Sequence, residues 1–575
     1  MKVSDYIAKY IEQQHVTTIF GYIGGMITHL VDSITSNKNI KFVQVYHEQT
    51  AAIAAEGYAK ESGNIGVAIS TSGPGATNMI TGIADAYFDS IPVVYITGQV
   101  NTYEYKYDTP LRQLGFQETN IIDIVKPITK YAVLVDDKEK IKYELEKAFY
   151  YAKEGRPGPV LLDIPMDIQR SEIDVENLIT FATNDNTNYS FDINEVLSLI
   201  KKAKRPMILV GAGCKGDKTK KELENFVKKT NFPIVSSLMG KGAFNECATN
   251  YLGMIGSYGN RCANMGMAKV DLLIALGSRL DIRQTGIINN FISEGIILHI
   301  DIDLNELNNN RLKNRIKIHS DVFSFLSKMN VVIAKLDTNG TWLNFLQNLK
   351  TKYNQKNEIE RFVENKSPYT FIQKLSDLSK KGDIFCADVG QNQMWAAQTL
   401  LLKKQQKFIT SGGLAPMGFS IPVSLGIAFA NPEANIISIN GDGGFHIALQ
   451  SLMLISQYNL PIKVIVMNNS ALGMITQFQT LYFEGRMNGT TKEGGYFTPD
   501  ISHISESYNL KYYKLSVTDL DDLDLLKEIM SCRNCIVEYN IDGQTMVSPK
   551  LEYNNKIEIM NPLLSENELN NNLYS

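Results

Sequence analysis

The sequence predicts an α/β protein of about three domains, in which parallel sheets are flanked by helices. Apolar runs typical of strands alternate with amphipathic helical patterns along the chain, and this alternation favours parallel strands joined by helical crossovers. The chain has 575 residues, which exceeds one ordinary hydrophobic core and suggests about three domains. Polar stretches at residues 180–189 and 350–366 separate the alternating segments and are typical of surface connections.

Local patterns predict the elements of each domain. The first domain covers residues 1–170, with Ser4 as the expected N-cap of a helix and strands at residues 17–20 and 160–164. The second domain covers residues 190–340, and the third covers residues 368–550. Their strand-like runs lie at residues 207–210, 234–236, 272–276, 296–302, 436–439 and 462–467. Residues 551–575 form a C-terminal tail rich in Glu and Asn, which we expect to pack poorly or to cover a neighbouring chain.

Composition argues against several classes of function. The net charge of −4 and the lack of a basic block do not fit a nucleic-acid surface. No apolar run reaches the roughly 18 residues of a membrane span, and the N-terminal residues lack the core of a signal peptide. We therefore expect a cytoplasmic protein with no nucleic-acid or membrane partner. The six cysteines are scattered and fit reduced thiols, and the CxxC spacing of Cys532 and Cys535 favours coincidence over redox function.

A glycine-rich turn in the third domain has the pattern of a metal and diphosphate site. A strand-like run leads into Gly441, Asp442, Gly443 and Gly444, and a helical pattern follows through Leu452. Such glycines let the backbone approach a diphosphate, and the helix start offers free N–H groups. Asp442 and, after the next apolar run, Asn469 supply two oxygens, which suits Mg²⁺ because that ion takes few protein ligands. The tripeptide alone marks any tight turn, but the whole strand, turn, helix and strand pattern predicts a magnesium–diphosphate site.

Motifs over most of the chain resemble one family. From about residue 6 to about residue 560, the chain is similar to thiamine diphosphate enzymes of the acetohydroxyacid (acetolactate) synthase large-subunit type. The segments that carry this resemblance are 20–25, 47–49, 55–59, 71–78, 155–160, 237–242, 388–391, 394–398 and 417–419, together with the glycine turn. No single segment is specific enough to identify the family. The order of all these segments along the chain is.

The resemblance implies three catalytic residues: Glu48, Gln117 and Met417. In this family the carboxylate matched by Glu48 bonds to the pyrimidine ring of thiamine diphosphate and promotes loss of the reactive proton. Met417 would hold the cofactor bent, and an unbranched apolar side chain suits that irregular space. Glu48 as a solvated helix-start carboxylate and Met417 as an ordinary core residue are the plain alternatives.

Further positions are matched to ligand-binding residues of the family. The carbonyl of Ala415 would orient the cofactor's exocyclic nitrogen, and the carbonyl of Ala471 would join Asp442 and Asn469 on Mg²⁺. Phe116 and Gln117 would line the substrate side from the partner chain, so the active sites would lie at the interface of a homodimer or homotetramer, with a regulatory subunit possible. Other positions matched to thiamine diphosphate are Gly24, Pro74, Asn78, Gln391, Gly473 and Met474.

The middle domain resembles the FAD-binding domain of this family, in which FAD is structural rather than redox-active. Glycines after strands allow close approach of a nucleotide, arginines pair with its diphosphate, and acids at strand ends accept from its ribose or base. A related domain that has lost FAD and kept its scaffold is the alternative. The matched positions are Arg156, Gly211, Gly213, Leu238, Met239, Gly277, Arg279, Asp281, Arg283 and Asp301.

Three positions depart from true acetohydroxyacid synthases. Phe478 stands where the family has the tryptophan that selects the acceptor, and it leaves a wider space. Met166 replaces a lysine that would attract a carboxylate, and Ile282 replaces an acid that would pair with Arg283. These changes point to an acceptor other than 2-ketobutyrate, although drift within a true acetolactate synthase explains them as well.

The sequence thus predicts a carboligase that decarboxylates pyruvate on thiamine diphosphate and transfers the hydroxyethyl unit to a carbonyl acceptor. That acceptor is either a second pyruvate, giving acetolactate, or a nucleotide-linked keto sugar. A non-ligating 2-keto acid decarboxylase or oxidase of the same superfamily is the alternative enzyme. A catalytically silent scaffold or regulatory subunit is the alternative from another class, and the joint presence of Glu48, Met417, Asp442 and Asn469 argues against it.

Overall fold

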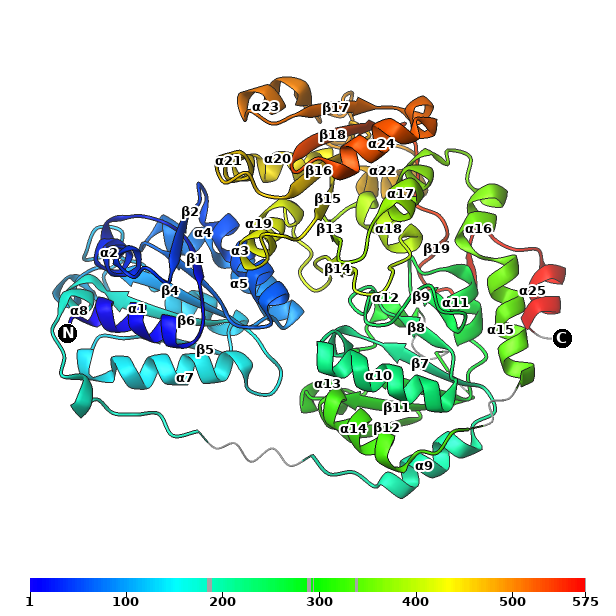
Figure 1. Cartoon of the computed structure of the whole chain (residues 1–575), viewed down its shortest axis with the longest axis horizontal. Coiled ribbons are helices and arrows are strands. Elements are labelled where there is room, and N and C mark those ends of the chain that lie inside the picture. Colours follow the sequence, from blue (N-terminus) through cyan, green and yellow to red (C-terminus); the bar gives the residue numbers. More distant parts are fainter. Residues whose placement is uncertain (184–188, 287–290, 293, 337–339, 574–575) are drawn as a thin grey trace.

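Three six-stranded parallel sheets, each flanked by helices, form the body of the protein (Figure 1). The computed structural model describes residues 1–183, 189–286, 291–292, 294–336 and 340–573. The predicted α/β class with three sheet domains is confirmed. Part of the predicted connection at 180–189 lies outside the described residues. No helix of the described residues is long and apolar enough to cross a membrane.

The first sheet has the strand order β2-β1-β3-β4-β6-β5. Its strands are β1 (Thr18–Tyr22), β2 (Lys41–Gln44), β3 (Gly66–Ser70), β4 (Val93–Gln99), β5 (Tyr131–Leu134) and β6 (Val160–Pro165). Its helices are α1 (Val3–Gln13), α2 (Thr28–Ser36), α3 (Glu48–Ser62), α4 (Pro74–Asn78), α5 (Ile80–Asp89), α6 (Ile121–Val125), α7 (Ile141–Lys153) and α8 (Met166–Arg170). The prediction of Ser4 as an N-cap was wrong, because Ser4 lies inside α1 and its buried hydroxyl accepts a hydrogen bond from Ser33.

The middle sheet has the order β12-β11-β10-β7-β8-β9. Its strands are β7 (Pro206–Val210), β8 (Ile234–Ser236), β9 (Tyr251–Met254), β10 (Leu272–Leu276), β11 (Ile296–Asp301) and β12 (Arg315–His319), of which β9 and β12 were not predicted. One face packs on α9 (Ile193–Lys202), α10 (Asp217–Thr230) and α14 (Val322–Val332). The other face packs on α11 (Arg261–Met267) and α15 (Gly340–Lys352). Two short helices, α12 (Ile282–Thr285) and α13 (Leu304–Asn308), follow β10 and β11.

The third sheet has the order β14-β13-β15-β16-β18-β17, which is the order of the first sheet when its strands are renumbered from one. The strands are β13 (Ile384–Ala387), β14 (Lys407–Ile409), β15 (Ile436–Gly441), β16 (Ile462–Asn468), β17 (Tyr512–Leu515) and β18 (Cys535–Asn540). The helices are α17 (Ser367–Leu378), α18 (Gln391–Thr399), α19 (Ser420–Ala430), α20 (Asp442–Ile447), α21 (Leu452–Gln457), α22 (Gly473–Tyr482), α23 (Ile501–Ser507) and α24 (Leu523–Ser531). The helical pattern expected from the glycine turn through Leu452 is therefore interrupted between α20 and α21.

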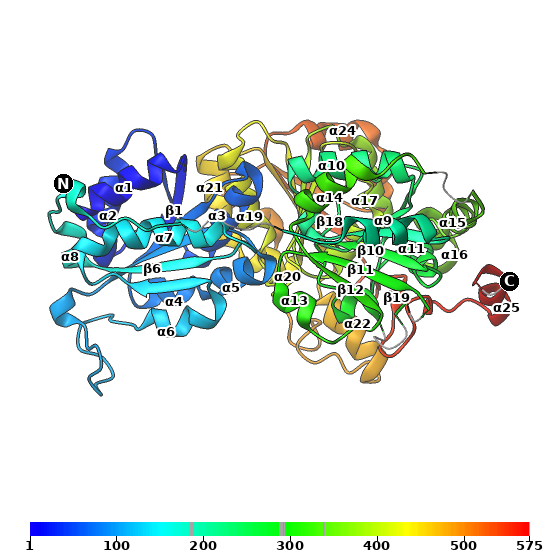
Figure 2. The ribbon, with the colours of Figure 1, turned by 90° about the horizontal axis from the view of Figure 1, so that it is seen from below.

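Helices α3 and α19 lie side by side between the first and third sheets (Figure 1, Figure 2). A Cβ on Gly57 would lie 2.1 Å from the carbonyl oxygen of Val423, and one on Gly426 would lie 1.8 Å from that of Ala54. The two backbones touch only because both positions lack a side chain. One continuous hydrophobic core runs from the first sheet across these helices to the third sheet, so the two domains are packed as one unit.

The segment 350–366 and the C-terminal tail differ from expectation. Residues 355–362 form helix α16 (Gln355–Phe362), in which buried Glu358 pairs with buried Arg261 at 2.7 Å, so the prediction of a plain surface connection was wrong. The described part of the tail packs on its own chain through β20 (Met560–Asn561), paired with β19 (Lys550–Leu551), and α25 (Glu566–Leu573). Glu568 of α25 lies 2.6 Å from Arg361 of α16. Both segments are held by ion pairs between residues far apart in the sequence, and such pairs cannot be inferred from the composition of the segment itself.

Candidate active site

Asp442 begins helix α20 at the carboxyl end of β15. Its Oδ1 accepts a hydrogen bond of 3.0 Å from the N–H of Gly443. Its Oδ2 is buried and has no hydrogen-bond partner among the described residues. Burial raises the pKa of Asp442 to about 7, and backbone N–H donors oppose that rise. A buried, unpaired carboxylate oxygen at a helix start is a feature that a bound cation would satisfy.

Asn469 lies beside Asp442 because β15 and β16 are neighbouring parallel strands, with Gly441 opposite Met467. Its Oδ1 accepts a bond of 3.3 Å from the N–H of Ala471, and its Nδ2 donates to Gln391 Oε1 at 3.2 Å. Gln391, the first residue of α18, also donates to Gln477 Oε1 and to the carbonyl of Thr545. The structure therefore gathers Asp442, Asn469, Ala471 and Gln391 at one sheet edge.

The glycines of this edge are sites of close approach. A Cβ on Gly444 would lie 2.0 Å from Asp388 Oδ2, and one on Gly473 would lie 2.0 Å from Gln391 Oε1. A Cβ on Gly443 would lie 2.9 Å from Met417 Cε, which places the methionine methyl group against the glycine turn. A side chain at any of these positions would collide with its neighbours, so glycine is required for the close packing of this edge. Met474, the second residue of α22, accepts a hydrogen bond of 3.4 Å from Tyr258 of the middle domain at its sulfur.

Met417 is held by a buried carboxylate that the sequence analysis did not assign. Asp388 accepts hydrogen bonds from the N–H groups of Gly418 at 3.0 Å and Phe419 at 3.1 Å. Burial raises the pKa of Asp388 to about 6. Ala415 has a left-handed φ of 60° and donates its N–H to Ser411 Oγ at 3.0 Å. The backbone on both sides of Met417 is therefore fixed by side chains of the same domain.

Glu48 begins helix α3 in the first domain, with His47 as the N-cap. The carboxyl group of Glu48 is buried, and its Oε2 accepts a hydrogen bond of 2.9 Å from Asn78 Nδ2. A Cβ on Gly75, the residue after Pro74, would lie 3.3 Å from Glu48 Oε1. The structure thus brings Glu48, Pro74 and Asn78 together. Among the residues described within one chain, no hydrogen bond or ion pair joins Glu48 to the third domain.

Three further predicted residues sit on loops of the first domain. Gly24 lies after β1, and a Cβ there would lie 2.6 Å from the side chain of Thr71. The loop between β4 and α6 carries Phe116 and Gln117 and extends away from the body of the domain (Figure 2). Phe116 is 79% exposed, and Gln117 has a left-handed φ of 64°. The Phe116 side chain is therefore presented outward, whereas Gln117 is half-buried and its Cβ lies 3.0 Å from the Cβ position of Gly73.

A second unassigned carboxylate, Glu118, closes that loop. Its Oε1 accepts from the N–H of Lys106 at 2.9 Å, and its Oε2 accepts from the N–H groups of Leu114 at 2.6 Å and Gly115 at 3.2 Å. Glu118 is buried. These three bonds tie both ends of the loop to the residue that follows Gln117, so they fix the turn in which Gln117 sits.

The predicted nucleotide residues of the middle domain gather at the carboxyl ends of its strands, where α/β sheets bind ligands. Gly211 follows β7, Gly277 follows β10, and a Cβ on Gly211 would lie 2.0 Å from the Gly277 carbonyl oxygen. The Gly213 N–H donates to that same carbonyl at 3.2 Å. Asp301 ends β11, and burial raises its pKa.

Charged side chains surround this edge. Arg279 lies 3.8 Å from Asp281, and Asp281 caps α12 through the N–H of Arg283 at 2.9 Å. Arg156 reaches from the first domain and pairs with Asp303 at 3.0 Å and Glu306 at 3.3 Å. Leu238 and Met239 follow β8, and a Cβ on Gly412 of the third domain would lie 2.5 Å from Met239 Sδ. The edge thus faces both neighbouring domains.

Two of the three departures from the family pattern, Phe478 and Ile282, are exposed, and Met166 is half-buried. Phe478 on α22 is 50% exposed and packs against Tyr482, with ring centroids 4.6 Å apart. Ile282 begins α12 and is 60% exposed. Met166 begins α8, directly after β6. Phe478 therefore stands at the start of an aromatic group on the same helix that carries Gly473 and Met474.

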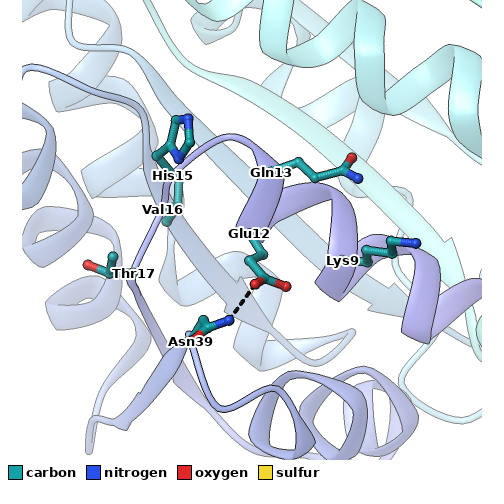
Figure 3. A pocket seen from close by; sticks show the side chains of 7 residues that line it. All are labelled: Lys9, Glu12, Gln13, His15, Val16, Thr17 and Asn39. Atoms are coloured by element: carbon teal, nitrogen blue, oxygen red, sulfur yellow. Dashed lines mark hydrogen bonds between the residues drawn. The ribbon is translucent and has the colours of Figure 1, made fainter.

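One surface hollow lies elsewhere (Figure 3). It has a volume of about 510 Å³ and is lined by residues of α1, of the turn before β1 and of the turn before β2, among them Glu12, His15 and Asn39. Asn39 donates to the Glu12 carboxylate at 2.5 Å, so the polar groups on its floor satisfy one another. None of the predicted site residues lines this hollow, and we assign it no role.

The sequence of the chain is similar to those of known thiamine pyrophosphate enzymes. Three family models of thiamine pyrophosphate enzymes match the chain: the N-terminal TPP binding domain at residues 1–124, the central domain at 193–329, and the C-terminal TPP binding domain at 388–537. A probable acetolactate synthase large subunit of Methanocaldococcus jannaschii is 36% identical over 560 residues, covering 94% of this chain and 92% of that protein. The large subunit of Buchnera aphidicola is 34% identical, covering 95% and 96%. The isozyme 2 large subunit of Escherichia coli is 35% identical, covering 89% and 90%.

Proposed function

Because the chain belongs to the thiamine pyrophosphate enzymes of the acetolactate synthase large-subunit type, we propose that it decarboxylates pyruvate and joins the two-carbon unit to a second pyruvate, giving acetolactate. The observation that carries the proposal is the unpaired, buried Oδ2 of Asp442 beside Asn469 at a turn of glycines. A turn that merely reversed the chain has no need of a buried carboxylate without a partner.

The residues of this edge fit Mg²⁺ and a diphosphate. Asp442, Asn469 and the carbonyl of Ala471 are the oxygens that would hold the cation, and the backbone of the glycine turn would bind the diphosphate. Thiamine diphosphate supplies, when bound, the nucleophilic carbon that no amino-acid side chain provides. Met417 lies against Gly443 and would support the cofactor from below, since its backbone is held by Asp388.

Glu48 has the environment of a proton-handling carboxylate. It is 7% exposed, and Asn78 fixes one oxygen while the other faces the turn at Gly75. The hydrogen bond from Asn78 fixes the orientation of the Glu48 carboxyl group, which suits a group that moves a proton of the pyrimidine ring. We assign Glu48 this role and Gln117 that of orienting the acceptor carbonyl.

A second copy of the chain would complete the site. Glu48 and Asp442 each lie at the carboxyl edge of a separate sheet. The first domain exposes Tyr103, Leu114 and Phe116, and the third exposes Ile475, Phe478 and Phe497. Large exposed apolar side chains at both edges fit an interface between copies, in a homodimer or homotetramer. A regulatory subunit would bind outside these edges.

FAD is proposed for the middle domain. Gly211, Gly277 and Asp301 meet at one sheet edge, and Arg279 stands there with a side chain 36% exposed. The purified protein should be yellow, and its activity should not depend on flavin turnover. A colourless, active preparation that takes up no FAD would reduce this domain to a scaffold.

A wider acceptor is the second candidate function, and Phe478 favours it. A half-exposed phenylalanine in place of the tryptophan of the family leaves space for a bulkier ketone, such as a nucleotide-linked keto sugar. The two acceptors share every earlier step, so they differ only in the product.

The direct test is product identification. Purified protein with thiamine diphosphate and Mg²⁺ is incubated with pyruvate alone and then with pyruvate plus 2-ketobutyrate or a nucleotide-linked keto sugar, and the products are identified by mass. Acetolactate from pyruvate alone supports the proposal. Carbon dioxide and acetaldehyde without a ligated product would support the non-ligating decarboxylase instead.

An Asp442→Ala variant provides the control at the metal site. It should lose cofactor affinity and require far more Mg²⁺, because one of the two side-chain oxygens proposed for the cation is gone. Asp521→Ala is the matched control, since that side chain is 97% exposed. A variant at Asp442 that binds the cofactor as wild type does would refute the metal site.

A further inference from the structure

Tyr496 brings a buried hydroxyl group to the glycine turn. Its oxygen has no hydrogen-bond partner among the described residues, and it lies 3.2 Å from the Cβ position of Gly443. Met417 and Leu472 border that same position. Because Gly443 directly follows Asp442 at the start of α20, the Tyr496 oxygen also lies near the Asp442 carboxylate. Two buried polar groups without partners, Asp442 Oδ2 and the Tyr496 hydroxyl, therefore lie close together.

The backbone around Tyr496 is fixed, so this placement is not that of a loose loop. The N–H of Tyr496 donates to the carbonyl of Thr491 at 2.8 Å. The carbonyl of Thr490 accepts from the N–H of Leu472 at 2.9 Å, and its hydroxyl donates to Gln479 Oε1 at 2.6 Å. The segment that carries the tyrosine is thus folded onto the start and the middle of α22.

The feature that packing alone does not account for is the hydroxyl group of Tyr496, not its ring. Phenylalanine would fill the same space and would bring no buried donor. A phenol has one O–H to donate, and an ionised carboxylate only accepts, so Asp442 is its complementary partner. Carboxylates that bind metals are themselves hydrogen-bonded by neighbouring groups, which fix their orientation.

We propose that Tyr496 is a positioning residue, whose hydroxyl donates a hydrogen bond to the Asp442 carboxylate and holds it in the orientation that binds Mg²⁺. This inference rests on the proposed function, because it requires the cation site at Asp442. It assigns to the segment after α22 a part in cofactor retention, in addition to any contact with substrate.

The test is Mg²⁺ binding by Tyr496→Phe. Isothermal titration calorimetry measures the Kd for Mg²⁺ of the full-length protein in saturating thiamine diphosphate. Loss of such a hydrogen bond weakens metal binding by roughly 10–100-fold, so the Kd should rise by that factor. The kcat at saturating Mg²⁺ should return close to wild type, because the ligands themselves remain. Tyr553→Phe removes the same atom from a side chain that is 83% exposed and is the matched control.

Other results would refute either the inference about Tyr496 or the proposed function. An unchanged Kd for Mg²⁺ in Tyr496→Phe would refute the inference, and so would a lowered kcat at saturating Mg²⁺ with an unchanged Kd, because the hydroxyl would then act on another group. Failure of the wild type to bind Mg²⁺ with thiamine diphosphate would instead refute the proposed function. Thermal unfolding without metal shows whether the variant folds, and the isosteric ring of phenylalanine should keep that midpoint near wild type.

Discussion

Replacing Glu118 by glutamine should loosen the loop that presents Gln117. The carboxylate accepts three backbone N–H bonds, one at Oε1 and two at Oε2. A glutamine keeps one acceptor oxygen, which at best retains Leu114 and Gly115, and its NH₂ then faces the N–H of Lys106. One hydrogen bond to a charged group is lost, worth about 1.5–3 kcal/mol.

The energy of this lost hydrogen bond is comparable to the backbone strain energy of the loop. The left-handed backbone of Gln117, with φ of 64°, costs roughly 1–2 kcal/mol, so the loop should relax once the Lys106 bond is gone. We expect kcat/KM for the acceptor to fall by about 10–100-fold, since each 1.4 kcal/mol is a factor of ten. Cofactor affinity and the thermal midpoint should change little, because the loop lies outside the core.

The assay is a double-mutant cycle of initial rates at varied acceptor concentration. Wild type, Glu118→Gln, Gln117→Ala and the double variant are compared, with Glu139→Gln as an exposed control. If Glu118 acts through Gln117, the two losses will not add. Additive losses, or an unchanged kcat/KM in Glu118→Gln, would refute this reasoning.

Three further predictions concern catalysis, pH and specificity. Glu48→Gln keeps the bond from Asn78 but not the charge, so turnover should fall by roughly 10²–10⁴-fold with calorimetric cofactor affinity unchanged, and near-normal turnover would contradict the role. Burial is the main cause that raises the pKa of Asp85 from 3.8 to about 7, and the neighbouring carboxylate of Asp89 adds to this rise. The other groups that face Asp85 are Glu56, Lys60 and Ser411. The folded state therefore holds this proton more tightly than the unfolded state does. The free energy of unfolding falls as the pH rises from 3.8 to about 7. Asp85→Asn should raise the melting midpoint relative to wild type more at about pH 8 than at about pH 5, and an equal difference at both would be evidence against this. Phe478→Trp should shift discrimination toward 2-ketobutyrate over pyruvate by ~1–3 kcal/mol in a competition assay analysed by mass, whereas a strong preference already present in wild type would indicate an ordinary acetohydroxyacid synthase.

The closeness of Asp442 and Asn469 at one sheet edge was predictable from the sequence because the parts of this edge are local. Strand, glycine turn and helix follow one another in the chain, and Asn469 directly follows β16, the strand that neighbours β15. Parallel neighbours bring their carboxyl ends together, so two short motifs sufficed. The ends of elements were less certain: Ser4 has the chemistry of an N-cap but lies within α1, where its hydroxyl pairs with Ser33.

Contacts that depend on distant parts of the chain could not be predicted. Glu358 is one charge in a polar segment, and its burial follows from Arg261, 97 positions away. Tyr496 stands in a glycine-rich stretch without regular secondary structure, so no periodicity marks it. Glu118 follows the matched residues Phe116 and Gln117, but its three bonds to the loop backbone are visible only in the folded loop.

The origin of each half of the site can be decided by mixing two inactive variants. The first and third sheets share one strand order, and Glu48 and Asp442 both stand at carboxyl edges, while α3 and α19 pack back to back through Gly57 and Gly426. If each active site takes Glu48 from one copy and Asp442 from the other, a dimer of Glu48→Gln with Asp442→Ala has one intact site and one doubly damaged site. Random mixing makes half of the dimers mixed, so about a quarter of wild-type activity should return in a twofold dimer. If both residues acted within one chain, every chain would carry a defect and mixing would restore nothing. Denaturing and refolding the two variants together, against each refolded alone, measures the difference.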